Sequence, residues 1–174
     1  MPGTRRTTAY LLLRLALGRT PHVVAMPFDR IVDAVAQGSV AAGLIIHESR
    51  FTYQTSGLHA ICDLGEWWEA ATGLPIPLGA ILARRDLPPS LAQSVNESIR
   101  ESLHFARTHE NRVMPYVRAH AFELAEDVMR KHIDLYVNEY SDDLSPSGRD
   151  AVNELIRRGR AAGLLPSSAE PDFA

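Results

Sequence analysis

Four polar side chains that can do chemistry directly follow an apolar run. The run is residues 40–46 (VAAGLII), and His47, Glu48, Ser49 and Arg50 come next. An imidazole has an ordinary pKa near ~6.5, so His47 can act as a general base at neutral pH. Glu48 or Ser49 can orient it, and the Arg50 guanidinium can bind a carboxylate through two parallel hydrogen bonds. The competing interpretation is a hydrogen-bonded histidine at a strand end, with Glu48 and Arg50 solvated.

A second candidate site is the start of the first helix, at Thr7, Thr8 and Ala9. The first N–H groups of a helix lack partners within it and carry partial positive charge. Together with a threonine hydroxyl they can bind a carboxylate or a phosphate. The commoner role of such a threonine is an ordinary N-cap, and both interpretations stay open.

Other classes of site find no support in the sequence. The seven histidines include no H-E-x-x-H pair, and the chain has no G-x-G-x-x-G, P-loop or G-x-S-x-G motif. The single cysteine, Cys62, excludes a disulfide framework and favours a reducing, cytoplasmic compartment. A net charge of −3 gives no basic excess for nucleic acid or an anionic membrane. The expected partner is therefore a small-molecule substrate, with no metal or cofactor.

The elements that position these residues are predicted from the apolar pattern. Helices are expected at residues 8–17, 29–37 and 66–72. Apolar runs at 22–26, 40–46, 59–62 and 78–83 are typical of buried strands. Alternating helices and strands predict an α/β lobe with a mostly parallel sheet, in which a ligand lies beyond the carboxyl ends of the strands.

The residue pattern changes after Pro88 and Pro89. Apolar residues recur at helical spacing from there on, with no strand signal, so the sequence predicts a wholly helical C-terminal region. The expected domains are residues 1–86, an α/β lobe with the candidate base, and residues 87–174, the helical region. The adjacent Trp67 and Trp68 point about 100° apart on a helix, so one is expected to be packed and the other half-exposed.

Several long strings carry a family resemblance. Residues 43–53 (GLIIHESRFTY) and 63–87 (DLGEWWEAATGLPIPLGAILARRDL), with 6–17 and 114–141, resemble the 1,4-dihydroxy-6-naphthoate synthase family. The resemblance implies a fold like the type 2 periplasmic binding proteins, with ligand bound between two lobes. It implies a cytoplasmic lyase of menaquinone biosynthesis that converts cyclic dehypoxanthine futalosine to 1,4-dihydroxy-6-naphthoate without an organic cofactor. It also implies His47 as the general base and Thr8 and Ala9 as substrate contacts.

One departure from the family pattern concerns length. The family has a long stretch before the helix at residues 8–17, and this chain of 174 residues lacks it. We therefore expect the helical region to pack partly on the missing lobe, and the chain alone to have little or no activity. The alternatives are a non-catalytic solute-binding module and an inactive fragment of the same fold. The oligomeric state is left open.

Overall fold

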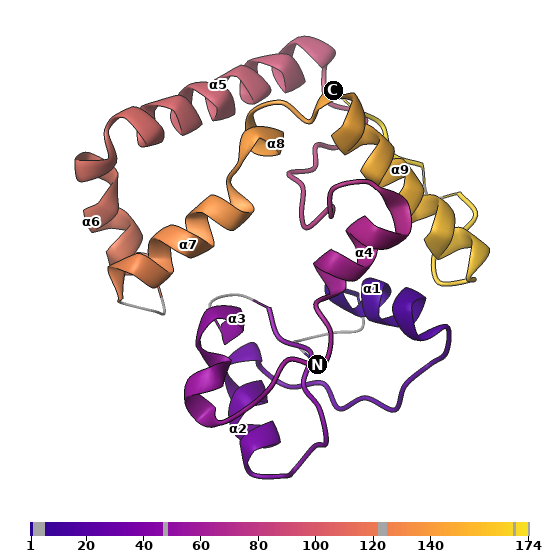
Figure 1. Cartoon of the computed structure of the whole chain (residues 1–174). Coiled ribbons are helices and arrows are strands. Elements are labelled where there is room, and N and C mark those ends of the chain that lie inside the picture. Colours follow the sequence, from indigo (N-terminus) through magenta and orange to yellow (C-terminus); the bar gives the residue numbers. More distant parts are fainter. Residues whose placement is uncertain (2–5, 47–48, 122–124, 169, 174) are drawn as a thin grey trace. The chain divides into compact units, whose positions relative to one another are not determined.

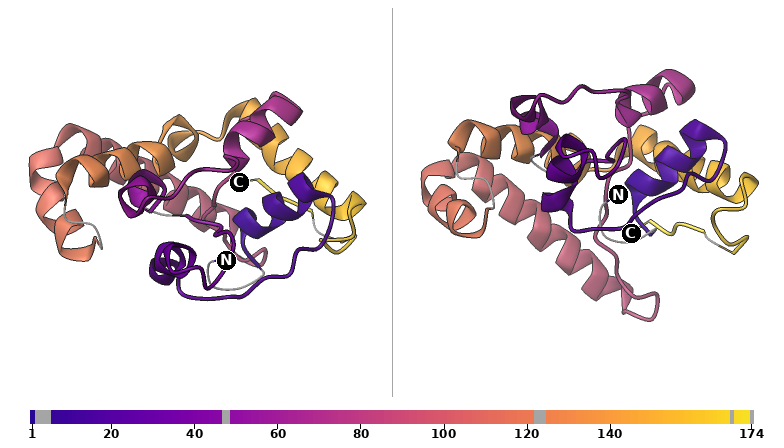
Figure 2. Two further views of the ribbon diagram at one scale, coloured as in Figure 1. Left: turned by 60° about the horizontal axis from the view of Figure 1, so that its bottom comes forward. Right: turned by 90° about the horizontal axis from the view of Figure 1, so that it is seen from below.

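The computed structural model describes residues 1, 6–46, 49–121, 125–168 and 170–173. Regular structure in these ranges is almost entirely helical (Figures 1 and 2). The elements are α1 (Thr8–Leu17), the 3-10 helix η1 (Phe28–Arg30), α2 (Ile31–Ala36), α3 (Ser49–Thr52), the 3-10 helix η2 (Tyr53–Ser56), α4 (Leu64–Thr72), α5 (Pro89–Thr108), α6 (Glu110–His120), α7 (Glu126–Tyr136), α8 (Glu139–Asp142) and α9 (Ser145–Ala161).

The chain divides into two compact units. The first unit is Met1–Leu78 together with Pro146–Pro171, so it takes in nearly all of α9. The second unit is Gly79–Ser145 together with Asp172–Ala174, and it contains α5 to α8. None of the helices in the described ranges has both the length and the apolar character needed to cross a membrane.

The prediction of an α/β lobe with a mostly parallel sheet is wrong, and so is the fold like that of the periplasmic binding proteins, which the family resemblance implied. No sheet is present in the described ranges, where the nearest feature is an isolated bridge at Met26. Its backbone N–H donates to the Met1 carbonyl oxygen at 3.2 Å. The runs 59–62 and 78–83 were predicted to be buried strands, but they are exposed apart from the half-buried Leu78. The predominance of helix agrees only with the prediction for the C-terminal region.

The physical reason lies in what an apolar run specifies. Such a run indicates a preference for burial, but a strand also needs a neighbouring segment that completes its backbone hydrogen bonds. Residues 22–26, 40–46, 59–62 and 78–83 have no such ladder in the described structure. The apolar pattern therefore does not determine which segments pair as strands.

α1 begins and ends as predicted, whereas α4 ends as predicted but begins at Leu64, two residues before the predicted start at residue 66. α1 is capped by the Thr7 side chain and ends at Gly18, whose φ of 62° is left-handed. α4 is capped by the Asp63 side chain and ends at Gly73, with φ of 67°. Glycine adopts this conformation without steric cost, so both helices end where the sequence has a glycine.

The core of the first unit joins three helices. Leu12 from α1, Trp68 from α4 and Leu155 from α9 form a buried apolar cluster. Trp68 is completely buried, whereas Trp67 is half-buried at the edge of the cluster, so the prediction for the tryptophan pair is confirmed. At Gly159 of α9, an added Cβ would lie 2.6 Å from Leu165 Cδ1, so a larger residue there would require the Leu165 side chain to shift.

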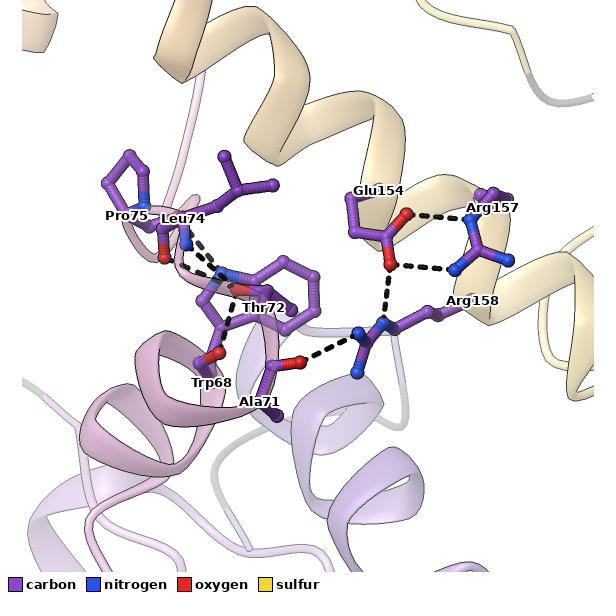
Figure 3. Close-up of polar contacts among 8 residues, drawn as sticks. All are labelled: Trp68, Ala71, Thr72, Leu74, Pro75, Glu154, Arg157 and Arg158. Atoms are coloured by element: carbon purple, nitrogen blue, oxygen red, sulfur yellow. Dashed lines mark hydrogen bonds and ion pairs between the residues drawn. The ribbon is translucent and has the colours of Figure 1, made fainter.

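Polar contacts surround this core (Figure 3). Trp68 Nε1 donates to the Pro75 carbonyl oxygen at 3.0 Å, which satisfies the buried indole N–H. Arg158 of α9 donates to the Ala71 carbonyl oxygen at 3.0 Å and to Glu154 Oε1 at 2.7 Å. Its guanidinium carbon lies 5.5 Å from the centre of a Trp68 ring. These contacts connect α9 to the C-terminal end of α4.

Glu154 gives the first unit a pH-dependent stability. Hydrogen bonds from Arg157 and Arg158 hold the pKa of its carboxyl at about 2, below the usual 4.5. Because the folded-state pKa is lowered, the contribution of Glu154 to the stability of the folded state is complete above about pH 4.5 and is lost as the pH falls toward 2.

We expect Glu154→Gln to lower the urea midpoint at pH 7 and to make the urea midpoint fall less steeply between pH 4.5 and 2. Glu69→Gln, at an exposed position of α4, is the control, and an equal change there would contradict the assignment.

The second unit is held together differently. Its buried hydrophobic residues, in the described ranges, are Met114 and Met129, and none of the 20 residues of α5 is buried. Ion pairs of exposed residues connect its helices instead: Arg107 with Asp134 at 2.8 Å, Arg118 with Glu126 at 2.7 Å, Arg100 with Asp142 at 3.3 Å, and Arg130 with Glu110. Figure 1 shows α6 joining the end of α5 to α7. Exposed ion pairs contribute only ~0–1 kcal/mol each, so this unit has little core of its own.

Candidate functional site

The two predicted substrate contacts lie at the N-terminus of α1. Thr8 and Ala9 are its first two residues, and both are half-buried. The Oγ1 of the preceding Thr7 accepts a hydrogen bond from the Tyr10 backbone N–H at 3.2 Å, which makes Thr7 the N-cap. This end of α1 has the polarity to bind an anion beside the Thr8 hydroxyl.

His47, the predicted general base, lies outside the described residues together with Glu48. The next described residue is Ser49, which begins α3, and Arg50 follows it. The structure therefore describes Thr8, Ala9 and Arg50, and the role of His47 stays a prediction.

Arg50 forms an ion pair that the sequence analysis missed. Its Nη2 donates to Asp63 Oδ2 at 3.2 Å. The other oxygen, Asp63 Oδ1, accepts from the backbone N–H groups of Gly65 at 2.7 Å and Glu66 at 3.3 Å. One carboxylate thus caps α4 with one oxygen and binds Arg50 with the other.

This ion pair connects α3 to the start of α4. Arg50 belongs to α3, just after His47 in the sequence, and Asp63 is the N-cap of α4. α4 in turn packs on α1, the helix that begins with Thr8 and Ala9. The sequence signal for the cap was an aspartate directly before a helix with a glutamate in its first turn. No sequence signal identified Arg50 as its partner, because the two residues belong to different elements.

The described residues of the candidate site do not form a set of metal ligands. In the part of the chain that the structure describes, no group of three or more His, Cys, Asp and Glu side chains is arranged to hold a metal ion. Cys62, next to Asp63, is exposed, and its Sγ lies 3.5 Å from the Asp63 carbonyl oxygen.

Known proteins resemble this chain over nearly its whole length. A sequence model of the menaquinone biosynthesis family matches residues 2–161. A 1,4-dihydroxy-6-naphtoate synthase of Thermus thermophilus is 50% identical over 99% of this chain and 63% of its own length. A 1,4-dihydroxy-6-naphtoate synthase of Streptomyces coelicolor is 46% identical over 92% of this chain and 59% of its own length. The chain therefore spans about three fifths of the length of these curated relatives.

A solved structure is similar as well. The crystal structure of a protein from Archaeoglobus fulgidus superimposes with a TM-score of 0.88 at 36% sequence identity. The match covers 94% of this chain and 62% of that one. The family strings at residues 43–53 and 63–87 fall within the matched range. On the extent of these matches, the chain belongs to the menaquinone biosynthesis family.

Proposed function

We propose that this chain carries the base-bearing part of a lyase that converts cyclic dehypoxanthine futalosine to 1,4-dihydroxy-6-naphthoate in the cytoplasm. The observation that supports this most strongly is the 50% identity to a relative named as a synthase of that naphthoate. The identity extends over the strings around His47 and around Asp63, so it includes the candidate site. The exposed Cys62 thiol suits a reducing compartment.

The proposed chemistry assigns a task to each site residue. His47 is the general base that removes a proton from a hydroxyl group of the sugar-derived ring, which starts a retro-aldol-type cleavage of a carbon–carbon bond. The start of α1, with Thr8 and Ala9, binds and orients the substrate through its free N–H groups and the Thr8 hydroxyl.

We also propose that the helical region, residues 87–174, packs partly on the additional length present in the relatives. Two observations support this. The match covers 63% and 59% of the length of the two relatives, so 37% and 41% of their length lies outside it. The long helix α5 is amphipathic, yet Leu91 and Val95 on its apolar side are 49% and 46% exposed. An amphipathic helix with an unburied apolar side needs a further protein surface to cover it.

A turnover assay tests the proposed function. The chain is incubated with cyclic dehypoxanthine futalosine, alone and together with the segment of the Thermus thermophilus relative that the match does not cover, produced as a separate polypeptide. We expect 1,4-dihydroxy-6-naphthoate to form in the mixture and little or none with the chain alone, because one part of a site positions substrate poorly. If a joined version of the two segments also gave no product, the proposed activity would be wrong.

Two lysine substitutions on α5 test the proposed packing. Leu91→Lys places a charge on the apolar side of the helix and is expected to weaken association with the added segment at least tenfold. Gln93→Lys, on the polar side of the same helix, is the matched control and is expected to change it little. Size-exclusion chromatography with light scattering measures the association. Equal behaviour of the two variants, or self-association of the chain through this side, would contradict the proposal.

A further inference from the structure

In the described part of the chain, the guanidinium of Arg50 hydrogen-bonds one side chain, that of Asp63. Its Nη2 binds one oxygen of Asp63 at 3.2 Å, and its central carbon lies 5.6 Å from the centre of the Phe51 ring. Asp63 has only this oxygen to offer, because its other oxygen caps α4. Since a guanidinium has five N–H donors, this contact leaves an edge with the geometry to receive a second carboxylate.

The contacts of Arg50 differ from those of several other arginines of the chain. Arg157 binds both oxygens of Glu154, and Arg84 binds both oxygens of Asp86. Each of these guanidinium groups therefore makes two hydrogen bonds to one carboxylate. Arg30 and Arg100 each form one ion pair, as Arg50 does, but their side chains are 73% and 50% exposed. Arg50 is 34% exposed. Water competes less with a ligand for a less exposed cation, so the hydrogen bonds between that cation and the ligand are stronger.

We infer that Arg50 binds the carboxylate of the aromatic ligand, and that Asp63 is the positioning residue that holds the Arg50 guanidinium in place for it. This inference rests on the proposed function, whose product is a naphthoate and therefore a carboxylate. A planar guanidinium is matched in shape to a carboxylate, and a bidentate pair fixes its direction as well as its position. Arg50 follows the proposed base, His47, by three residues in the sequence.

Two ligands that differ in one group test the inference. 2-Naphthoate carries the carboxylate, and 2-naphthamide is its neutral counterpart with the same rings. The dissociation constants of both for this chain are measured by nuclear magnetic resonance titration. We expect the unmodified chain to prefer the naphthoate by about tenfold or more, the effect of a hydrogen bond to a charged group. Arg50→Gln is expected to remove this preference, and Arg50→Lys to keep part of it.

Two further variants separate positioning from general structure. Asp63→Asn keeps a residue that caps helices well but removes the negative charge that holds Arg50. It is expected to reduce the preference for the naphthoate severalfold with little change in the melting temperature of the chain. Arg30→Gln removes an exposed arginine of the same unit and is expected to leave the preference unchanged.

Each outcome decides for or against Arg50. If Arg50→Gln kept the full preference while Thr8→Ala lost it, the N-terminus of α1 would be the carboxylate site and the inference would be wrong, although the proposed function would stand. If the unmodified chain bound both ligands equally or not at all, Arg50 would hold no carboxylate. The turnover assay is independent of this titration, so failure of the proposed function is recognised separately.

Discussion

Replacing Trp68 by alanine is expected to cost the first unit about 3–5 kcal/mol of unfolding free energy. The side chain is completely buried in the cluster that joins α1, α4 and α9, and its removal leaves a cavity there. It also leaves the Pro75 carbonyl oxygen without the 3.0 Å hydrogen bond from the indole. A loss of this size is a large part of the 5–15 kcal/mol typical of a domain. Urea unfolding followed by circular dichroism measures it.

The neighbouring tryptophan is the matched control. Trp67 has the same volume and lies on the same helix, but it is half-buried at the edge of the cluster. Trp67→Ala is expected to cost about 1 kcal/mol, the usual effect of a single substitution. If the two variants had equal urea midpoints, the apolar cluster would not be the main support of the first unit.

Replacing His47 by alanine is expected to reduce turnover about 10²–10⁴-fold, the usual contribution of a positioned general base. The measurement is the rate of 1,4-dihydroxy-6-naphthoate formation at saturating substrate, with the chain and the added segment of its relative together. Because His47 is proposed to act on the bound substrate, the loss is expected in kcat with little change in KM.

His59→Ala provides the control for this substitution. His59 belongs to the same unit, is exposed, and has no proposed role in the reaction. Its variant is expected to retain the full rate and the same melting temperature. Unchanged turnover in His47→Ala would remove His47 from the mechanism, whereas a rate lost equally in both variants would indicate damage to the fold.

Local features of the fold could be predicted from the sequence because they depend on neighbouring residues. Both ends of α1 and the end of α4 at Gly73 were predicted, since caps and left-handed glycines act within one helical turn, whereas the Asp63 cap of α4 was not. The helices after Pro88 were predicted for the same reason, from apolar spacing along each segment. These signals do not require knowledge of what covers an element.

Features that depend on distant partners were not predicted. The apolar runs at 40–46 and 78–83 were expected in a sheet, but the pairing of strands is not encoded in either run. The ion pair of Arg50 with Asp63 was missed because both residues are ordinary surface types in isolation. The assignment of Thr8 and Ala9 came from the family resemblance, and the structure adds only their place at the start of α1.

The first unit is built from two separate stretches of the chain, which affects when its core can form during biosynthesis. Leu12 and Trp68 leave the ribosome before Leu155, which completes their cluster, because Leu155 belongs to α9 and follows Gly79–Ser145, the main segment of the second unit. Contacts between residues so far apart in the chain close a long loop and form slowly. The part of the apolar surface of α1 and α4 that Leu155 covers is therefore exposed until translation has passed α9. During that interval the nascent chain is a natural client for chaperones that bind exposed apolar segments.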